Sequence, residues 1–409
     1  MGTLFKYTGH SGHVYSLAWS PDAQRLVSAS RDGTAQIWDT NTGQRLANLA
    51  GHSGKVGGVA WSPNGRWIAA GVDDNFALVA DAASGQPILT YQGHSASVSC
   101  VAWSPDSTRV ASGSLDSTAQ VWNASTGQQL ASYKGHPSGS PEMKNIAGMP
   151  GMPPAGAAPG APGMPGAANP YMPQMPNMPQ NPYMPQQPGM QPNPYMPQMA
   201  QQPAMPQNPY MPQMPTAPNM PQNPYANMPN IAAMQNPAYA AQWAAQAMAA
   251  ASARPARIMG IAWSPDGRYV VSAGPDAHVW DAATGQKLSS FSGHTSYLTS
   301  VSWSPDGSRI ATASGDKTVQ LWNAGNGQLI GSYTGHAAQV LSVSWSPDGR
   351  RVASASFDRT VHVWDGSNGQ HLFAYTAHTD AVNAVAWSPD GSRIASASFD
   401  QTVHIWSPA

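Results

Sequence analysis

The chain of 409 residues is long enough for two or three ordinary domains or for one large repeat architecture. Its 19 Lys and Arg residues and 20 Asp and Glu residues give a formal net charge of −1, which supplies neither the basic surface typical of nucleic-acid binding nor an acidic tail. The single cysteine, Cys100, excludes an internal disulfide framework and favours a reducing compartment.

The first ten residues contain no apolar core and no small-residue cleavage site, so they do not predict a secretory signal. No run of about 18 apolar residues occurs anywhere, and nothing in the sequence therefore predicts a membrane span. We expect a cytoplasmic protein that binds neither membrane nor nucleic acid.

An internal repeat dominates the chain on both sides of one long interruption. The tripeptide Trp-Ser-Pro occurs seven times, 40 or 42 residues apart within each uninterrupted half, at Trp19, Trp61, Trp103, Trp263, Trp303, Trp345 and Trp387. A Gly-His or Ala-His pair precedes six of these units, with its histidine at His10, His52, His94, His294, His336 and His378. A second tryptophan follows in six units, at Trp38, Trp122, Trp280, Trp322, Trp364 and Trp406. A fixed period of this length predicts a repeat architecture.

Within a unit the pattern is that of strands. The sixth unit has four short runs rich in β-branched and aromatic residues, at 340–346, 351–356, 360–365 and 370–376. Turn-forming sequences such as Pro347-Asp348-Gly349 separate them. Four antiparallel strands in a unit of about 40–45 residues, with Gly-His and Trp-Asp signals, are typical of a β-propeller.

All seven units, about 290 residues together, resemble the WD-repeat family. The resemblance implies an all-β, seven-bladed β-propeller in which each repeat contributes the outer strand of one blade and three strands of the next. The N-terminal sequence LFKYTGH matches LFAYTAH at Leu372–His378, and the chain ends on a third strand. We therefore expect residues 3–8 to complete the last blade and close the ring. Blades 1–3 and the closing strand fall in residues 1–136, and blades 4–7 in residues 257–409.

Each full unit carries a His, a Ser, an Asp and a Trp, which invites comparison with a Ser-His-Asp catalytic triad. The resemblance implies instead a buried hydrogen-bonded chain that runs from His to Asp and from Ser to the indole N–H. Since an enzyme needs one nucleophile and not six, we predict a structural network with no catalytic residue, metal or cofactor. Its members are His10, Ser28, Asp32, Trp38, His94, Asp116, Trp122, His294, Asp316, Trp322, His336, Asp358, Trp364, His378, Asp400 and Trp406.

Two units depart from this pattern. The second keeps His52 and Asp74 but has Ala70 and Ala80 in place of the Ser and the closing Trp. In the fourth we expect no histidine, because the interruption displaces His136. Cys100 occupies a position where other units have Ser or Ala, so we interpret it as a packing residue and not as a nucleophile.

We assign residues 137–256 to an insertion between blades 3 and 4, which holds 18 of the 20 Met residues and most of the Pro. Such a composition predicts mostly irregular or polyproline-II structure, with a helix over 237–252. A repeated NPYMPQ motif contains Tyr171, Tyr183, Tyr195 and Tyr210. Its Met residues recur every three positions and could dock a partner, bind another copy of the chain or, less consistently with the absence of His and Cys, hold Cu(I).

Two positions vary among otherwise similar units: the residue before the turn Asp, and the residue four positions before the tryptophan of Trp-Ser-Pro. The resemblance implies that both face partners on one side of the ring. The resemblance also implies that the insertion opens on this side and could itself cover the surface. Blades 6, 7 and 1 bring aromatic and polar residues to these positions, namely Tyr15, Arg31, Leu341, Phe357, Asn383 and Phe399. We predict a protein-interaction scaffold of bacterial type, with a self-assembling structural protein linked through its insertion as the alternative.

Overall fold

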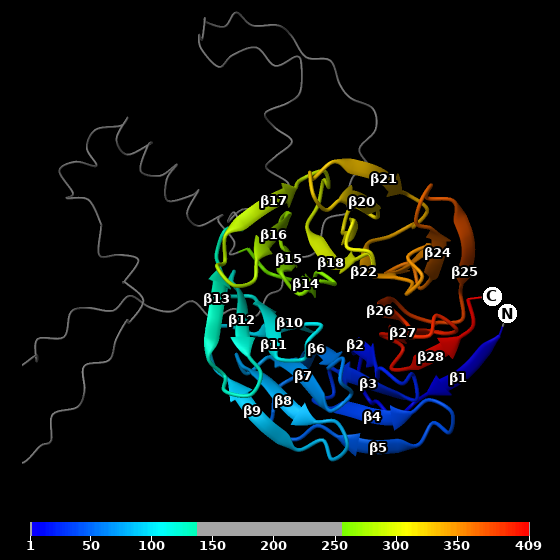
Figure 1. The fold of residues 1–409 in the computed structure, drawn as a ribbon. Helices are drawn as coiled ribbons and strands as arrows, with labels where there is room; N and C mark the ends of the chain where they lie inside the picture. The colour runs from blue at the N-terminus through cyan, green and yellow to red at the C-terminus, as the bar shows by residue number, and fades with distance from the viewer. Residues whose placement is uncertain (1, 137–255, 409) are drawn as a thin grey trace, which may run out of the picture. The chain divides into compact units, whose positions relative to one another are not determined.

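The computed structural model describes residues 2–136 and 256–408. They form seven four-stranded antiparallel sheets, arranged as blades around a central channel (Figure 1). The seven-bladed, all-β propeller predicted from the repeats is confirmed, as is the position of the long interruption between blades 3 and 4. The predicted helix at 237–252 lies outside the described residues.

The first three blades lie before the interruption. Blade 1 consists of β2 (Val14–Trp19), β3 (Arg25–Ser30), β4 (Ala35–Asp39) and β5 (Arg45–Asn48). Blade 2 consists of β6 (Val56–Trp61), β7 (Trp67–Val72), β8 (Ala77–Asp81) and β9 (Pro87–Tyr91). Blade 3 consists of β10 (Val98–Trp103), β11 (Arg109–Ser114), β12 (Ala119–Asn123) and β13 (Gln129–Tyr133).

Three further blades follow the interruption. Blade 4 consists of β14 (Gly260–Trp263), β15 (Tyr269–Ala273), β16 (Ala277–Asp281) and β17 (Lys287–Phe291). Blade 5 consists of β18 (Leu298–Trp303), β19 (Arg309–Ser314), β20 (Val319–Asn323) and β21 (Leu329–Tyr333). Blade 6 consists of β22 (Val340–Trp345), β23 (Arg351–Ser356), β24 (Val361–Asp365) and β25 (His371–Tyr375).

Blade 7 combines both ends of the chain. It consists of β26 (Val382–Trp387), β27 (Ile394–Ser398), β28 (Val403–Trp406) and, as its outer strand, β1 (Thr3–Tyr7). β1 pairs antiparallel with β28, and Tyr7 lies opposite Val403. The two termini therefore lie side by side (Figure 1), and the predicted closure of the ring is confirmed.

The hydrophobic core lies between neighbouring blades and not at the centre of the ring. Each of its clusters joins residues of adjacent sheets; for example, Val363 and Tyr375 of blade 6 pack with Val385 and Trp387 of blade 7. The second strand of each blade is buried almost throughout, since it has a sheet neighbour on both sides and another blade on each face. This stacking holds each blade edge at a fixed position for the polar contacts described next.

Candidate functional site

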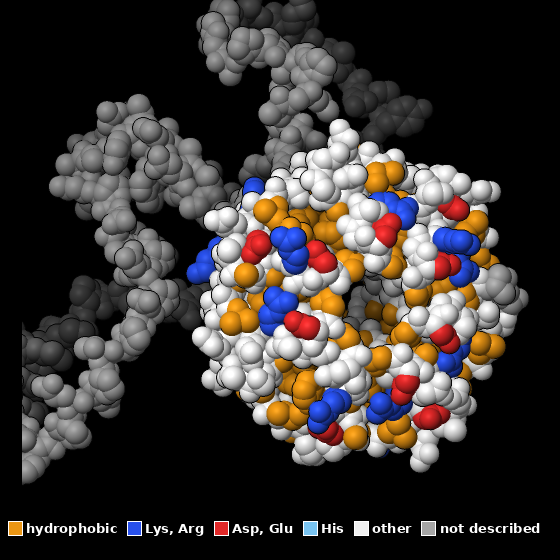
Figure 2. Space-filling view, viewed as in Figure 1, with side chains coloured by type: hydrophobic (Ala, Val, Ile, Leu, Met, Phe, Trp, Pro, Cys, Tyr) orange, Lys and Arg blue, Asp and Glu red, His pale blue; other side chains and the backbone are white. Residues whose placement is uncertain are grey.

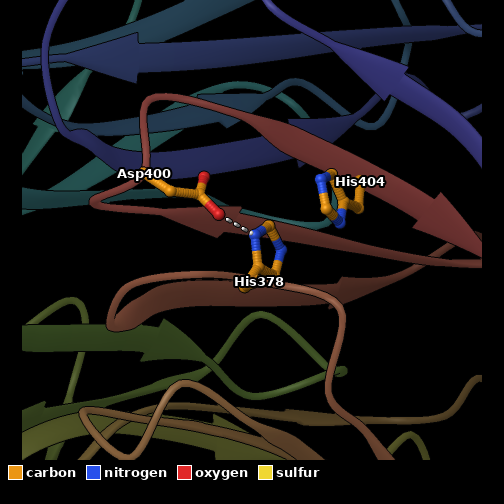
Figure 3. A group of neighbouring side chains, drawn as sticks. All are labelled: His378, Asp400 and His404. Atoms are coloured by element: carbon orange, nitrogen blue, oxygen red, sulfur yellow. Dashed lines mark hydrogen bonds and ion pairs between the residues drawn. The ribbon is translucent and has the colours of Figure 1, made fainter.

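Blade 7 contains the whole repeated polar set, of which Figure 3 shows His378 and Asp400. Nδ1 of His378 lies 2.9 Å from the carboxylate of Asp400, and Nε2 lies 2.9 Å from Oγ of Ser396. The indole N–H of Trp406 donates to the same Ser396 oxygen at 3.2 Å. The backbone N–H of Thr379 donates to Asp400. The set thus ties the corner before β26 to β27 and β28.

The same His–Asp contact recurs in blades 1, 3, 5 and 6, with Nδ1 to carboxylate distances of 2.8–2.9 Å. The pairs are His10–Asp32, His94–Asp116, His294–Asp316 and His336–Asp358. Burial opposes ionisation of Asp116, but hydrogen bonds from His94 and Thr118 outweigh it and hold its pKa well below the usual range. The carboxylates are therefore ionised at neutral pH, and each accepts donors from two segments of its blade.

The indole end of the set is less uniform than the sequence predicts. The N–H of Trp122 donates to Ser112 at 3.1 Å, and that of Trp322 to Thr312 at 2.8 Å. In blades 1 and 6 the expected bond is absent, because the indole nitrogens of Trp38 and Trp364 are buried without a hydrogen-bond partner among the described residues. Ser28 still receives its contact from His10 at 2.8 Å. For Trp38 and Trp364 the predicted link from Ser to indole is therefore wrong.

The structure also corrects the prediction for blade 4. His136 is not displaced by the insertion: its Nε2 lies 2.7 Å from Oγ of Ser272, which also accepts from the indole N–H of Trp280 at 3.1 Å. The histidine keeps its place because the chain stays in register with the other repeats for three residues beyond Tyr133. Blade 2 lacks the set, and Asp74 accepts from Ser53 and Gly54 at the surface.

A second polar pair, which the sequence analysis missed, joins neighbouring blades at five of the seven junctions. The tyrosine that ends an outer strand bonds to a Gln or His on the third strand of the next blade. Tyr91 donates to Gln120 at 2.5 Å, and the hydroxyl of Tyr375 lies 2.9 Å from Nδ1 of His404. The signal was available, because this third-strand position alternates between Gln36, Gln120, Gln320 and His278, His362, His404 among the units.

In blades 4, 6 and 7 this second histidine stacks on the first. The ring centroids of His378 and His404 lie 3.9 Å apart with planes at 12°. Burial, followed by repulsion from His378, lowers the pKa of His404 to about 3. The equivalent stacks are His136–His278 and His336–His362.

These arrangements favour a structural role over chemistry. The possible ligand atoms of His378, Asp400 and His404 all lie within 4.8 Å of one another, as a metal site would require. However, every ring nitrogen of the two histidines already has a hydrogen-bonding neighbour, and the parallel rings do not converge on one point. Ser396 is fully buried, so its hydroxyl is not accessible to a substrate.

One end of the central channel contains the variable positions. A cavity of about 480 Å³ is lined by all seven residues found four positions before the Trp-Ser-Pro tryptophans. They are Tyr15, Gly57, Ser99, Met259, Thr299, Leu341 and Asn383. Asn383 also donates to the carbonyl of Tyr15 at 2.5 Å, so part of its polarity serves the contact between blades 7 and 1.

Next to this cavity, four rings form what we call the aromatic sector: His13, Tyr15, Phe357 and Phe399. Phe399 stacks on His13 with centroids 4.5 Å apart and meets Tyr15 and Phe357 edge-on at 6.0 and 6.3 Å. Phe357 is 51% exposed. Arg31 is exposed at the corresponding turn of blade 1. His13 was not among the predicted residues, and Tyr171, Tyr183, Tyr195 and Tyr210 lie outside the described residues.

Cys100 lines the same channel. Burial raises the pKa of its thiol to about 12, so the thiol stays protonated at neutral pH and is a poor nucleophile. On the face shown in Figure 2, acidic and basic side chains are interspersed around a hollow centre. The residues that the structure describes form no helix long and apolar enough to span a membrane.

A closed ring of seven sheets, with a repeated hydrogen-bonded polar set in its blades and varied residues at one channel mouth, defines a propeller of the class typical of protein-interaction scaffolds. The family model "WD domain, G-beta repeat" matches residues 2–39, 43–81, 85–123, 252–281, 285–323, 327–365 and 369–407, and the chain belongs to this WD40 family.

Similarity to individual relatives is confined to about one repeat. Guanine nucleotide-binding protein subunit beta from Nicotiana tabacum is 51% identical over 37 residues, which cover 9% of this chain and 10% of the relative. The proteins of the same description from Arabidopsis thaliana and Solanum tuberosum match to the same extent, 51% over 37 residues. The chain thus spans about a tenth of the length of these relatives, which supports the repeat type and not a shared activity.

Proposed function

We propose that the protein is a protein-interaction scaffold that captures a partner at the aromatic sector and the adjoining channel mouth. The observation that carries the proposal is the exposure of Phe357, 51%, inside a cluster of four rings. Exposed aromatic rings that are held by their neighbours are typical of interface hot spots, since they bury a large area at little entropic cost. The similarity to G-beta subunits is consistent with a binding role but names no partner.

The sector differs from the rest of the same surface. The turn positions equivalent to Phe357 and Phe399 carry Asp73 in blade 2 and Gly315 in blade 5. The His and Asp of the repeated polar set hydrogen-bond to each other in blades 1, 3, 5, 6 and 7, which supports a structural role for them over a catalytic one. We place the protein in the cytoplasm, with no role in binding nucleic acid or membranes, and include the Met- and Tyr-rich insertion as a second contact surface.

The test is affinity capture from the source organism with the double variant Phe357→Ala and Phe399→Ala. We expect the variant to lose the captured proteins while it melts within a few degrees of the parent. The control is Leu46→Ala with Ile330→Ala, which removes two similarly exposed hydrophobic side chains from outer strands β5 and β21. Identical capture profiles for the sector variant and the parent would overturn the proposal.

A self-assembling structural protein is the alternative, and the composition of the insertion favours it, because repeated Tyr, Met and Pro residues can bind further copies of the chain. Sedimentation over a range of concentrations distinguishes the two functions. Association that disappears when residues 140–253 are deleted would support self-assembly; a monomer at all concentrations, with capture intact, would support the scaffold.

A further inference from the structure

The junctions between blades repeat one contact, and two junctions lack it. At five junctions an arginine at the start of a second strand places its guanidinium 4.6–5.0 Å from the ring of the Trp-Ser-Pro tryptophan in the next blade. The pairs are Arg25–Trp61, Arg109–Trp263, Arg309–Trp345, Arg351–Trp387 and Arg393–Trp19. The two exceptions are Trp67, between blades 2 and 3, and Tyr269, between blades 4 and 5.

Two carbonyl positions of the next blade receive the guanidinium. The first lies four residues after the Trp-Ser-Pro tryptophan, as where Arg309 donates to Gly349 at 3.1 Å and Arg109 to Gly267 at 2.9 Å. The second lies two residues after the closing tryptophan, as where Arg309 donates to Gly366 at 2.9 Å. A planar fork of donors above an aromatic ring suits this geometry, which an ammonium group cannot reproduce.

At the junction between blades 2 and 3, the ring of Trp67 takes the place of the guanidinium. The ring of Trp67 stacks on Trp103 with centroids 6.1 Å apart and planes at 18°, and Trp103 is only 7% exposed. A groove of about 360 Å³ remains nearby, but its lining does not include the face of Trp103. The place above the tryptophan is therefore filled.

At the junction between blades 4 and 5, the space above the Trp-Ser-Pro tryptophan is open to solvent. Trp303 is partly exposed, whereas the other six Trp-Ser-Pro tryptophans are buried. Trp303 and Tyr269 line a groove of about 390 Å³, together with Leu288 and the carboxylates of Asp266 and Asp306. The smaller tyrosine does not fill the volume that an arginine or a tryptophan occupies elsewhere.

The hydrogen-bond acceptors for a guanidinium are still present in this groove. Gly307 and Ala324, the residues equivalent to Gly349 and Gly366, both line it. Within the described residues, neither of their carbonyl oxygens has another donor. Asp266 also lacks the partner that Asp306 has in Arg309, since the residue three positions after Asp266 is Tyr269.

We propose that this groove binds the arginine side chain of a partner protein, with the guanidinium over Trp303. Asp266 and the carbonyls of Gly307 and Ala324 accept its N–H groups, and Leu288, 55% exposed, contacts its aliphatic stem. Charge complementarity selects a cation, because Asp266 lies at the groove without the arginine partner that Asp306 has in Arg309. Two basic side chains lie close to this groove: the exposed Arg268, whose guanidinium lies 5.4 Å from the ring of Tyr269, and Arg309, which is paired with Asp306. The site shares no residue with the aromatic sector and does not depend on the function proposed above.

The probe is the capped tripeptide acetyl-Gly-Arg-Gly-amide, titrated into the full-length, ¹⁵N-labelled chain. The indole N–H signal of Trp303, assigned with Trp303→Phe, reports occupancy. We expect a saturable shift with a dissociation constant on the order of millimolar, as one stacked cation with a few hydrogen bonds provides. The citrulline and lysine analogues are expected to bind at least about tenfold more weakly.

Two variants use the chain's own solutions at the equivalent position. Tyr269→Arg recreates the internal guanidinium of five junctions, and Tyr269→Trp recreates the filled junction of blades 2 and 3; each is expected to abolish the shift while the propeller melts normally. Arg268→Ala removes the opposing charge and is expected to tighten binding. If one of these two Tyr269 variants does not fold, the other still tests whether the arginine binds in the groove. No shift in the parent chain, equal binding of the lysine analogue, or unchanged binding in a folded Tyr269 variant would overturn the proposal.

Discussion

Tyr91 and Gln120 join two blades through one hydrogen bond, which the phenol hydroxyl at the end of β9 donates to Oε1 of the amide in β12 across 2.5 Å. Between blades 4 and 5 the tyrosine is replaced by Phe291, and Oε1 of Gln320 is buried without a hydrogen-bond partner among the described residues. A buried acceptor that lacks its donor destabilises the folded state by about 1–3 kcal/mol.

Phe291→Tyr should therefore stabilise the protein. The new hydroxyl would donate to Gln320, and we expect the free energy of unfolding to rise by about 1 kcal/mol. Trp322 must move to make room for this hydroxyl. The edge of its ring lies next to Gly293, at the position that the Tyr91 hydroxyl occupies next to Gly93. We expect Trp322 to shift from its tilted contact with Phe291, 36°, to the stacked geometry that Tyr91 and Trp122 adopt, 9°.

The matched change in the opposite direction is Tyr91→Phe, which leaves Gln120 without its donor and should lower stability by about 1–2 kcal/mol. Urea unfolding of both variants measures the two effects. A Phe291→Tyr variant that is less stable than the parent would show that the packing of Trp322 outweighs the hydrogen bond.

The architecture was predictable from the sequence because its signals are local and repeat seven times. The corner histidines, the turns and the match between Leu4–His10 and Leu372–His378 each define an element without knowledge of its neighbours. Even His136 could have been retained, since it follows Tyr133 at the spacing that separates Tyr91 from His94 and Tyr375 from His378.

Contacts between blades were not predictable in the same way. Tyr91 and Gln120 are 29 positions apart and lie in different sheets, so their hydrogen bond depends on how two blades pack. The absence of a partner for the Trp38 indole depends on how the side chains around it pack, which no repeat pattern encodes. The groove at Trp303 likewise follows from one substitution, Tyr269, whose effect appears only when the junctions are compared in space.

The hydrogen bond between His94 and Asp116 should contribute more to stability than the contacts of the equivalent surface carboxylate in blade 2. In Asp116→Ala, Nδ1 of the buried His94 loses its carboxylate partner and keeps only the longer contact with Thr118, and we expect the free energy of unfolding to fall by about 2–4 kcal/mol. Asp74→Ala in blade 2 is the control, because this carboxylate is exposed and bonds only to Ser53 and Gly54. The melting temperature of Asp116→Ala should be clearly lower than that of Asp74→Ala. Equal melting temperatures would show that the His–Asp hydrogen bond adds nothing beyond ordinary turn contacts.

The stacked histidines predict a particular dependence of stability on pH. Burial, then repulsion from neighbouring histidines, lowers the pKa of His362 to about 4 and that of His404 to about 3. Below an unfolded pKa of about 6.5 the unfolded chain takes up protons that the folded chain refuses, so stability falls as the pH falls from there toward the folded values. The lowered pKa of Asp400 affects stability only at lower pH. Its contribution to stability is complete above the usual aspartate pKa and is lost as the pH falls below that value.

Replacement of both histidines by glutamine, the residue native to this position in blades 1, 3 and 5, should reduce that loss. His362→Gln with His404→Gln keeps an acceptor for Tyr333 and Tyr375 and removes the two titrations. Between pH 7 and 5 the slope of the unfolding free energy should decrease by at most about 1.4 kcal/mol per pH unit for each histidine. His13→Gln in the aromatic sector serves as the control. A slope equal to that of the parent would show that the stacked pairs do not titrate in this range.

Closure of the ring by β1 should be worth more than the contacts of any single side chain. β1 pairs with β28 along its length, and Tyr7 stacks on Trp38 of blade 1 at 4.6 Å and 3°, so the strand fastens the last blade to the first. Deletion of residues 1–9 exposes the edge of β28 to pairing with other chains, and we expect a loss of several kcal/mol, about 3 or more, or aggregation. Lys6→Ala, which changes an exposed side chain of the same strand, should leave melting unchanged. Scanning calorimetry with light scattering measures both outcomes, and a deletion variant that remains monomeric and melts with the parent would refute the closure.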